Sequence, residues 1–321
     1  MKTPTPLTTL SRFRRPTGVL CFSLLIASST LLPAATLMNE TFTGSTVSSS
    51  SATPPYTVTS DGLNGSSGVT WNTTLAASNA GGTYTIAADR ATGPDLGSND
   101  NALSMKPGAN KTPGYLGAFE ATTLAVGDTI TLSFDARYGT SAGTPSARGM
   151  RFGLFNSNGT PYTSGTSDTY DDNDSGYRVD VPYNSTATAP LIGKEAGGGG
   201  SAGGGNDFTQ FSDAVSNVNL LTTSANFSLS ITRISLTQAL VDVKVNGTSI
   251  VASETKIQDD SGVFSFDEVM LTVAATGTAT TFLIDNISVI TTSSIPEPST
   301  YALLASVLIG TGVIATRRKR H

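Results

Sequence analysis

The chain has 321 residues and a formal net charge of −5, and it contains one cysteine, Cys21, and one histidine, His321. A single cysteine excludes an internal disulfide, and the two residues lie near opposite ends of the chain. The part between them has no Cys or His nucleophile system, no Ser-His-Asp triad and no ordinary zinc site. Carboxylate chemistry, oxygen-ligated calcium and binding remain.

Residues 1–35 have the pattern of a secretory signal peptide. Three arginines between positions 12 and 15 precede an apolar stretch at 19–32, and small residues up to Ala35 follow it. This order of basic, apolar and small residues is typical of a cleaved signal. We expect cleavage after Ala35 by the general secretory route and a mature chain that starts at Thr36.

Export would also change the charge balance. The signal peptide and the basic tail together hold eight of the 19 Lys and Arg residues, which leaves 11 against 24 acidic residues, a net charge of −13. So acidic a protein is a poor partner for nucleic acid or for an anionic membrane surface. The composition therefore argues against both as partners.

Residues 36–292 are predicted to form one all-β domain, because runs with a period of two recur and no sustained period of 3.6 appears. Residues 129–138 alternate cleanly, with Ile130, Leu132 and Phe134 on one face. Similar runs occur near residues 150–154, 177–181, 227–231, 241–245 and 269–273. Turn signals such as Asn158-Gly159 and Asn246-Gly247 separate them. Many short strands with such turns predict a β-sandwich. We expect the glycine-rich run 196–205 to be a surface loop, the alternative being a linker between two domains.

One loop gathers acidic residues at the spacing of possible metal ligands. Four carboxylates within seven positions would repel each other, and Ca²⁺ would relieve that repulsion with the oxygen ligands it prefers. The four residues are Asp168, Asp171, Asp172 and Asp174. The loop does not follow the EF-hand pattern. The alternative, a solvated acidic loop, is the more common arrangement on surface domains.

The order of the strands resembles the concanavalin-type or LamG-like jelly roll. The segments that carry the resemblance are 40–42, 127–134, 151–155, 243–247 and 282–287. The resemblance implies a jelly-roll type β-sandwich, a fold that hosts lectins, hydrolases and passive surface domains alike. In many such domains the first and last strands pair and hold a structural calcium, which would bring Glu40 toward Asp285. The alternative places Asp285 on a solvated face of its strand.

The C-terminal segment 293–321 combines three parts in order. Pro296-Glu297-Pro298 is followed by an uncharged apolar run at 301–316 and then by basic residues. As a helix, this run would reach roughly 24 Å, enough to span a bilayer with local thinning. The basic residues are Arg317, Arg318, Lys319 and Arg320. They should stay in the cytoplasm, which places the preceding chain on the outer side. The alternative is a plain tail anchor.

This arrangement resembles the PEP-CTERM sorting signal of exported bacterial proteins. The resemblance covers only the last twenty-odd residues and rests on the Pro-Glu-Pro motif, the apolar run and the basic cluster. It implies recognition by an exosortase, a membrane protease that cuts near the motif. It also implies transient membrane anchoring before delivery to the cell surface or the extracellular matrix.

The sequence offers little for catalysis. It lacks the Glu-x-Asp-x-x-Glu run of laminarinase-type jelly rolls, and only Asp267-Glu268 lies near a predicted strand. Neighbours in a strand point to opposite faces, so these two cannot act on one glycosidic bond without a bulge. We therefore expect a non-catalytic surface or matrix protein with a structural or glycan-binding role in exopolysaccharide. The alternatives are a carboxylate-dependent glycoside hydrolase and a membrane-anchored adhesin.

Overall fold

The computed structural model describes the β-sandwich in several separate ranges of residues. The described residues are 34–41, 46–47, 57–59, 70–74, 83–88, 101–106, 114–138, 149–160, 174–181, 190–195, 208–213, 224–251, 257–273 and 282–293. They form β-strands and turns and contain no helix. The all-β prediction is confirmed.

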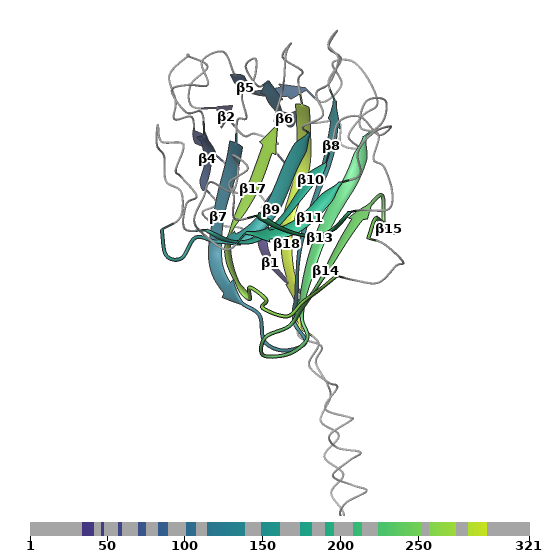
Figure 1. The fold of residues 1–321 in the computed structure, drawn as a ribbon. Helices are drawn as coiled ribbons and strands as arrows, with labels where there is room; N and C mark the ends of the chain where they lie inside the picture. The colour runs from purple at the N-terminus through teal and green to yellow at the C-terminus, as the bar shows by residue number, and fades with distance from the viewer. Residues whose placement is uncertain are drawn as a thin grey trace, which may run out of the picture. The chain divides into compact units, whose positions relative to one another are not determined.

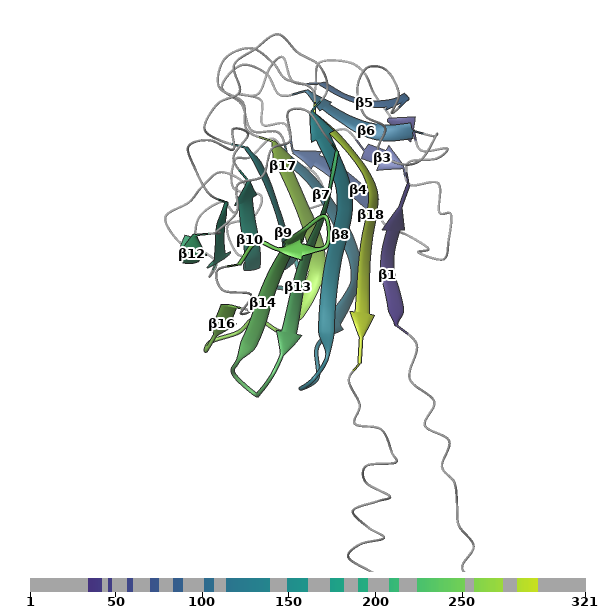
Figure 2. The ribbon, with the colours of Figure 1, turned by 90° about the vertical axis from the view of Figure 1, so that its right-hand side faces the viewer.

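The described strands are numbered in chain order, and Figures 1 and 2 together label them. They are β1 (Ala35–Glu40), β2 (Thr46–Val47), β3 (Thr57–Thr59), β4 (Thr70–Thr74), β5 (Thr83–Ala88), β6 (Asn101–Lys106), β7 (Gly114–Thr123), β8 (Thr129–Tyr138), β9 (Met150–Asn156), β10 (Ser175–Val181), β11 (Leu191–Glu195), β12 (Phe208–Asp213), β13 (Ala225–Arg233), β14 (Ala239–Val245), β15 (Thr248–Ser249), β16 (Ile257–Asp259), β17 (Ser265–Val273) and β18 (Phe282–Thr292).

These strands make two antiparallel sheets that face each other as a sandwich (Figures 1 and 2). Sheet A has the order β15-β14-β13-β8-β18-β6-β5, with β1 also paired to β18 and β16 to β14. Sheet B has the order β12-β11-β10-β9-β17-β7-β4-β3-β2. Because neighbouring strands in both sheets are often distant in sequence, the pairing brings together residues that no local motif connects.

The core lies between the sheets and follows the predicted alternation. In β8 the side chains of Ile130, Leu132 and Phe134 are fully buried. Phe134 meets Phe152 of sheet B edge to face, with ring centroids 5.0 Å apart, and stacks on Phe227 at 5.4 Å. Aromatic pairs of this geometry contribute about 0.5–1.5 kcal/mol each beyond the area they bury. The alternating strands thus supply the contacts that hold the two sheets together.

Two of the predicted turns have the backbone that their sequence requires. Asn158 and Gly159 have φ of 50° and 84°, and Asn246 and Gly247 have φ of 50° and 78°. Positive φ at both central residues matches the twist of a hairpin, and asparagine followed by glycine adopts it at the lowest cost. Both turns are confirmed.

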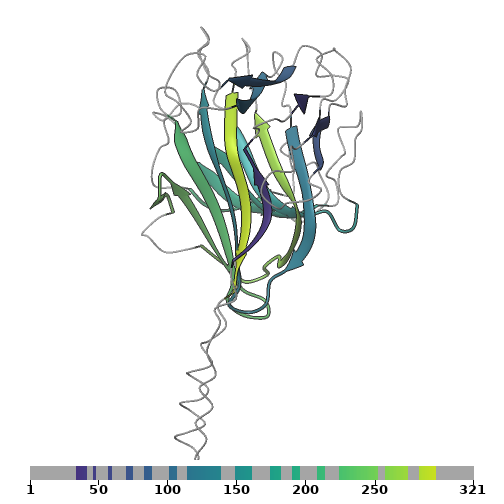
Figure 3. The same ribbon diagram turned by 180° about the vertical axis from the view of Figure 1, so that it is seen from behind.

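The first and last strands of the sandwich pair with each other. Figure 3 shows β1 lying beside β18. The register joins Ala35 to Thr291 and Glu40 to Ile287. The pairing expected from the jelly-roll resemblance is confirmed. Because the strands are antiparallel, β1 begins and β18 ends at the same end of the sandwich.

Candidate functional site

The carboxylates expected at the strand ends lie on neighbouring strands, and both are buried. Glu40 is the last residue of β1, and Asp285 lies in β18 beyond the paired Ile287. Asp285 has an exposed fraction of 0%, so its placement on a solvated face is wrong. Beside Asp285 the strand β18 has an irregularity: the register with β8 shifts between Asp285 and Ser288. Within it, Asn286 adopts a φ of 53° and donates its N–H to Asp285 Oδ1 at 2.7 Å.

A row of amides crosses sheet A beside Asp285. Asp285 faces Asp135 of β8 in register. The Asp135 carboxylate accepts hydrogen bonds of 2.9 Å from the side-chain amides of Asn226 and Asn286, on the strands to either side. The Asn226 backbone N–H in turn donates to Asn246 Oδ1 at 2.9 Å. Amide donors therefore compensate the Asp135 charge across three strands.

The acidic loop is described only at its last residue. Asp174 directly precedes β10 and is 3% exposed, whereas Asp168, Asp171 and Asp172 lie outside the described residues. Within the described part of the chain, no three Asp, Glu, His or Cys side chains gather closely enough to hold a metal ion. Both calcium predictions therefore stay predictions.

The outer face of sheet B carries a set of charged residues that sequence analysis did not identify. We call Arg151, Arg178, Asp180 and Glu195 the charge cluster. Arg178 forms ion pairs with Glu195 and with Asp180 (Nε to Oδ1, 2.8 Å), and Arg151 Nε lies 3.2 Å from Asp180 Oδ2. The Arg178 guanidinium also lies 4.1 Å from the ring centroid of Phe208. Arg178 and Glu195 are buried, so their charges are compensated by each other and by the neighbouring members of the cluster.

Glycines flank the arginine on both neighbouring strands. Gly153 of β9 and Gly193 of β11 are the register partners of Arg178. A Cβ at Gly193 would come within 2.5 Å of both the Phe208 ring and the Thr209 carbonyl oxygen. The close approach of Phe208, and with it the stacking on Arg178, therefore requires glycine at position 193.

The two carboxylates considered for catalysis, Asp267 and Glu268, lie in different surroundings. Asp267 accepts hydrogen bonds from the backbone N–H and the hydroxyl of Ser157, at 2.8 Å and 2.7 Å. It thereby fixes the turn after β9, in line with the capping role that such pairs usually have. Glu268 is 1% exposed and belongs to the outer face of sheet B. The register with β7 shifts between Phe266 and Glu268, so a bulge does occur here.

Glu268 and Glu195 share one row across sheet B. The row runs through Phe155 of β9 and Gly176 of β10. Three strand spacings place their backbones roughly 14 Å apart. The carboxyl groups of a glycosidase pair lie ~5 Å or ~6.5–9.5 Å apart. The register therefore disfavours an acid and base pair formed by these two residues.

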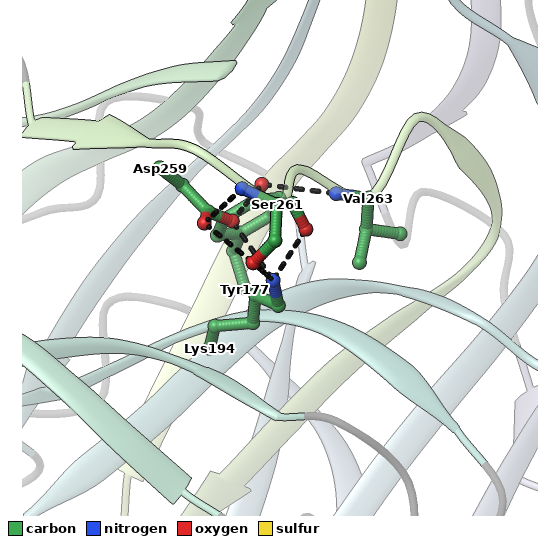
Figure 4. Close-up of polar contacts among 5 residues, drawn as sticks. All are labelled: Tyr177, Lys194, Asp259, Ser261 and Val263. Atoms are coloured by element: carbon green, nitrogen blue, oxygen red, sulfur yellow. Dashed lines mark hydrogen bonds and ion pairs between the residues drawn. The ribbon is translucent and has the colours of Figure 1, made fainter. Parts of the chain in front are cut away.

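A second polar group lies at the edge of the sandwich and joins the two sheets (Figure 4). The Tyr177 hydroxyl donates to Asp259 Oδ2 at 2.8 Å and accepts the Val263 N–H at 3.1 Å. Lys194 Nζ reaches the same Asp259 oxygen at 3.1 Å and the Ser261 hydroxyl at 2.7 Å. Tyr177 and Lys194 belong to sheet B, whereas β16, which contains Asp259, pairs with sheet A. We call these residues the inter-sheet latch.

The latch shifts the pKa values of its members in opposite directions. Burial, followed by the hydrogen bond and the charge of Asp259, raises the pKa of Tyr177 far above its usual value. Burial alone would raise the pKa of Asp259, but hydrogen bonds from Ser261, Tyr177 and Lys194 outweigh it and lower that pKa. The phenol is thus held protonated and the carboxylate ionised.

The segment that follows β18 matches a known family. Residues 294–320 match the family described as the PEP-CTERM protein-sorting motif. The chain carries a PEP-CTERM sorting motif. This motif begins two residues after the last strand, and its Pro296, Glu297 and Pro298, its apolar run 301–316 and its basic tail 317–321 lie outside the described residues. Among the residues that are described, no helix is long and apolar enough to cross a membrane.

The β-sandwich that precedes the PEP-CTERM motif is similar to several solved structures. The Emp46p carbohydrate recognition domain in its metal-free form has 10% identity and a TM-score of 0.41, with 70% of this chain and 89% of that chain covered. The cellulose induced protein Cip1 has 14% identity and a TM-score of 0.41, covering 68% and 90%. The alginate lyase Aly36B has 14% identity and a TM-score of 0.35, covering 65% and 96%. No curated protein matches the chain.

Proposed function

We propose that this protein is an exported, non-catalytic component of the cell surface or the extracellular matrix. The observation that carries the proposal is the PEP-CTERM motif at residues 294–320, placed directly after the strand that completes sheet A. In this proposal the signal peptide 1–35 starts export, and the apolar run 301–316 holds the chain transiently in the inner membrane. An exosortase-like protease then cuts near Pro296-Glu297-Pro298.

The carboxylates of the sandwich support a non-catalytic role. Asp267 is bound to Ser157, Glu195 is paired with Arg178, and Asp135 is bound by two asparagines. A general acid or base needs an accessible carboxyl group opposite a second one. The described carboxylates named here are instead committed to internal contacts.

The outer face of sheet B is our candidate for glycan binding. The partly exposed members of its charge cluster offer a guanidinium donor and a carboxylate acceptor, which suit the hydroxyl groups of a sugar. Arg151 and Asp180 are the more exposed members, at 11% and 21% of their side chains. They would make the first contact with a polysaccharide of the surrounding matrix.

Affinity electrophoresis against the producer's own exopolysaccharide tests this role. We expect the protein to be retarded and Arg151→Gln to weaken the retardation, while the control Lys244→Gln, which changes a charge on sheet A, leaves it unchanged. Reducing-sugar release is measured on the same samples. Release of reducing sugar by the wild-type protein would establish the hydrolase alternative. Retardation of Arg151→Gln as strong as that of the wild-type protein and of Lys244→Gln would exclude the charge cluster as the binding face.

A structural calcium ion is also proposed. The candidates are the loop that ends at Asp174 and the strand ends at Glu40 and Asp285. Buried carboxylates at both places support the proposal, because Ca²⁺ favours oxygen ligands that are held in position.

The alternative of a membrane-anchored adhesin differs only in the cleavage near Pro296-Glu297-Pro298. Without that cleavage the protein would stay on its C-terminal helix.

A further inference from the structure

The large hydrophobic side chains that are exposed in the described part of the chain gather in two turns. Val126, Ile234 and Leu236 are 53%, 36% and 78% exposed. Val126 lies in the turn between β7 and β8, and the other two lie in the turn between β13 and β14. Single exposed apolar residues are common on proteins, but a group that shares one place indicates an interaction surface.

One arginine holds these two turns together. Arg233 donates from Nη1 to the Leu124 carbonyl oxygen at 2.7 Å, from Nε to Ser235 O at 3.1 Å and from Nη2 to Leu236 O at 3.3 Å. Its backbone also bonds to both Gly127 and Asp128. The guanidinium is thus used inside the protein, where it fixes the backbone of both turns. The apolar side chains project from a rigid support.

The C-terminal segment leaves the sandwich beside the same turns. Thr292 of β18 pairs with Thr129, the first residue of β8, and the Ser293 hydroxyl donates to Asp128 at 2.6 Å. We call this end of the sandwich the exit pole. Seven residues, 294–300, separate it from the apolar run. Fully extended, they reach at most about 25 Å.

We propose that the exit pole rests on the surface of the lipid bilayer, with Val126, Ile234 and Leu236 in the boundary between headgroups and acyl chains. This inference rests on the proposed function, because it needs the segment 301–316 to anchor the chain. The short tether gives the pole a high effective concentration at the membrane, so a contact too weak to bind alone becomes populated.

The charges of the pole determine what kind of lipid contact this is. Asp128 and the exposed Asp260, which accepts hydrogen bonds from Gln238 and Gln258, add negative charge, and the Arg233 guanidinium is bound internally. The pole would therefore not attract anionic lipid headgroups electrostatically. The contact is apolar, shallow and insensitive to salt. It would orient the sandwich with the opposite end of β14 toward the matrix.

A fluorescent probe on the pole tests the proposal. The full chain with Cys21→Ser and Leu236→Cys is labelled with an environment-sensitive dye and reconstituted in phosphatidylcholine vesicles, with and without nitroxide-labelled lipid. Thr248→Cys, exposed at the far end of β14, is the matched control, and Val126→Cys is a second site on the pole. Flotation of the vesicles shows separately whether the chain is anchored.

We expect the dye at positions 236 and 126 to shift to the blue and to be quenched by the nitroxide lipid, and the dye at 248 to do neither. Salt should not change this result. A chain that floats with the vesicles but keeps the probe at 236 in water would overturn the lipid contact while leaving the anchor intact. A chain that does not float would overturn the anchoring step of the proposed function. Protection of position 236 that requires an added exosortase would make the pole a docking site for that protease instead.

Discussion

Tyr177 of sheet B and Asp259 of sheet A are joined by a hydrogen bond of 2.8 Å in which the buried phenol donates to the carboxylate. The same phenol oxygen accepts the Val263 N–H. One hydroxyl group therefore satisfies a carboxylate and a backbone donor on the segment that follows β14, and it does so from the opposite sheet. Loss of this hydroxyl group should therefore lower the stability of the sandwich by more than the loss of one hydrogen bond would.

Tyr177→Phe should destabilise the domain by about 1–3 kcal/mol, because it leaves the Val263 N–H and one oxygen of Asp259 without this partner. For a domain of this size the melting temperature would fall by roughly 2–4 °C per kcal/mol. A double-mutant cycle with Asp259→Asn should give a coupling energy of about 0.5–3 kcal/mol. Additive effects of the two substitutions would show that the contact contributes nothing of its own.

The latch should also make stability depend on pH at both extremes. The pKa of Asp259 is lowered in the folded state, so its contribution is present above the ordinary carboxyl pKa of about 3.9 and is lost as the pH falls below it. The pKa of Tyr177 is raised, so its contribution is present below about 10 and is lost as the pH rises above that value. Urea unfolding as a function of pH measures both limbs. Tyr177→Phe should flatten the alkaline limb and Asp259→Asn the acid limb, and unchanged limbs would assign the titration to other groups.

Replacement of Pro296-Glu297-Pro298 by three alanines should leave the full-length chain in the inner membrane. The expected cut lies near this motif, and without the prolines the helix of the apolar run could start earlier and hide the site. Cell fractionation with an immunoblot distinguishes precursor from product. Ser299→Ala, which changes a neighbouring residue outside the motif, is the control. Normal release from the triple-alanine variant would remove the motif from the sorting mechanism.

If calcium is bound, a concentration of about 100 times its dissociation constant should stabilise the domain by ~2.7 kcal/mol, and EDTA should reverse the effect. Asp171→Asn with Asp174→Asn should abolish the rise in melting temperature if the acidic loop holds the ion. Asp285→Asn should do so if the strand ends hold it. Identical melting curves with calcium and with EDTA would make both places purely structural.

Gly193→Ala should destabilise the domain by about 1–3 kcal/mol, since the new methyl group would overlap the Phe208 ring and the Thr209 carbonyl oxygen. Because β12 or β11 must move to relieve the overlap, Phe208 should also lose its contact with Arg178. Thermal melting measures the first effect and glycan retardation the second. A variant as stable as the wild type would mean that β12 is free to shift away from β11.

The elements that the sequence predicts well are those in which neighbouring residues carry all the information. The alternation of Ile130, Leu132 and Phe134 is a property of one strand, and the turn at Asn246-Gly247 is a property of two residues. Arg178 and Glu195 instead meet only because β10 and β11 pair in one particular register. No local pattern in the sequence specifies that register.

Asp285 shows a different limit of prediction from the sequence. The first three residues of its strand are apolar, and a polar residue that interrupts such a run ordinarily marks a solvated face. Ile284 and Ile287 both lie in the core, so the phase of the alternation changes at the irregularity around Asn286. The periodicity therefore does not predict that Asp285, in register with Asp135, is buried. An asparagine directly after an aspartate in a strand is the signal that would have indicated a bulge, since asparagine tolerates positive φ better than most residues.

The position of β18 has a mechanical consequence. Its second half lies between β8 and β1 and is bonded to both, and the sorting segment continues directly from its end. Hydrogen bonds between antiparallel strands are perpendicular to the strands. A pull on the C-terminal segment along β18 would therefore load the bonds to both neighbours together in shear, and they could not open one after another. If the chain is anchored and transferred by its C-terminal segment, as we propose, the sandwich would resist the force through both neighbours of β18 at once.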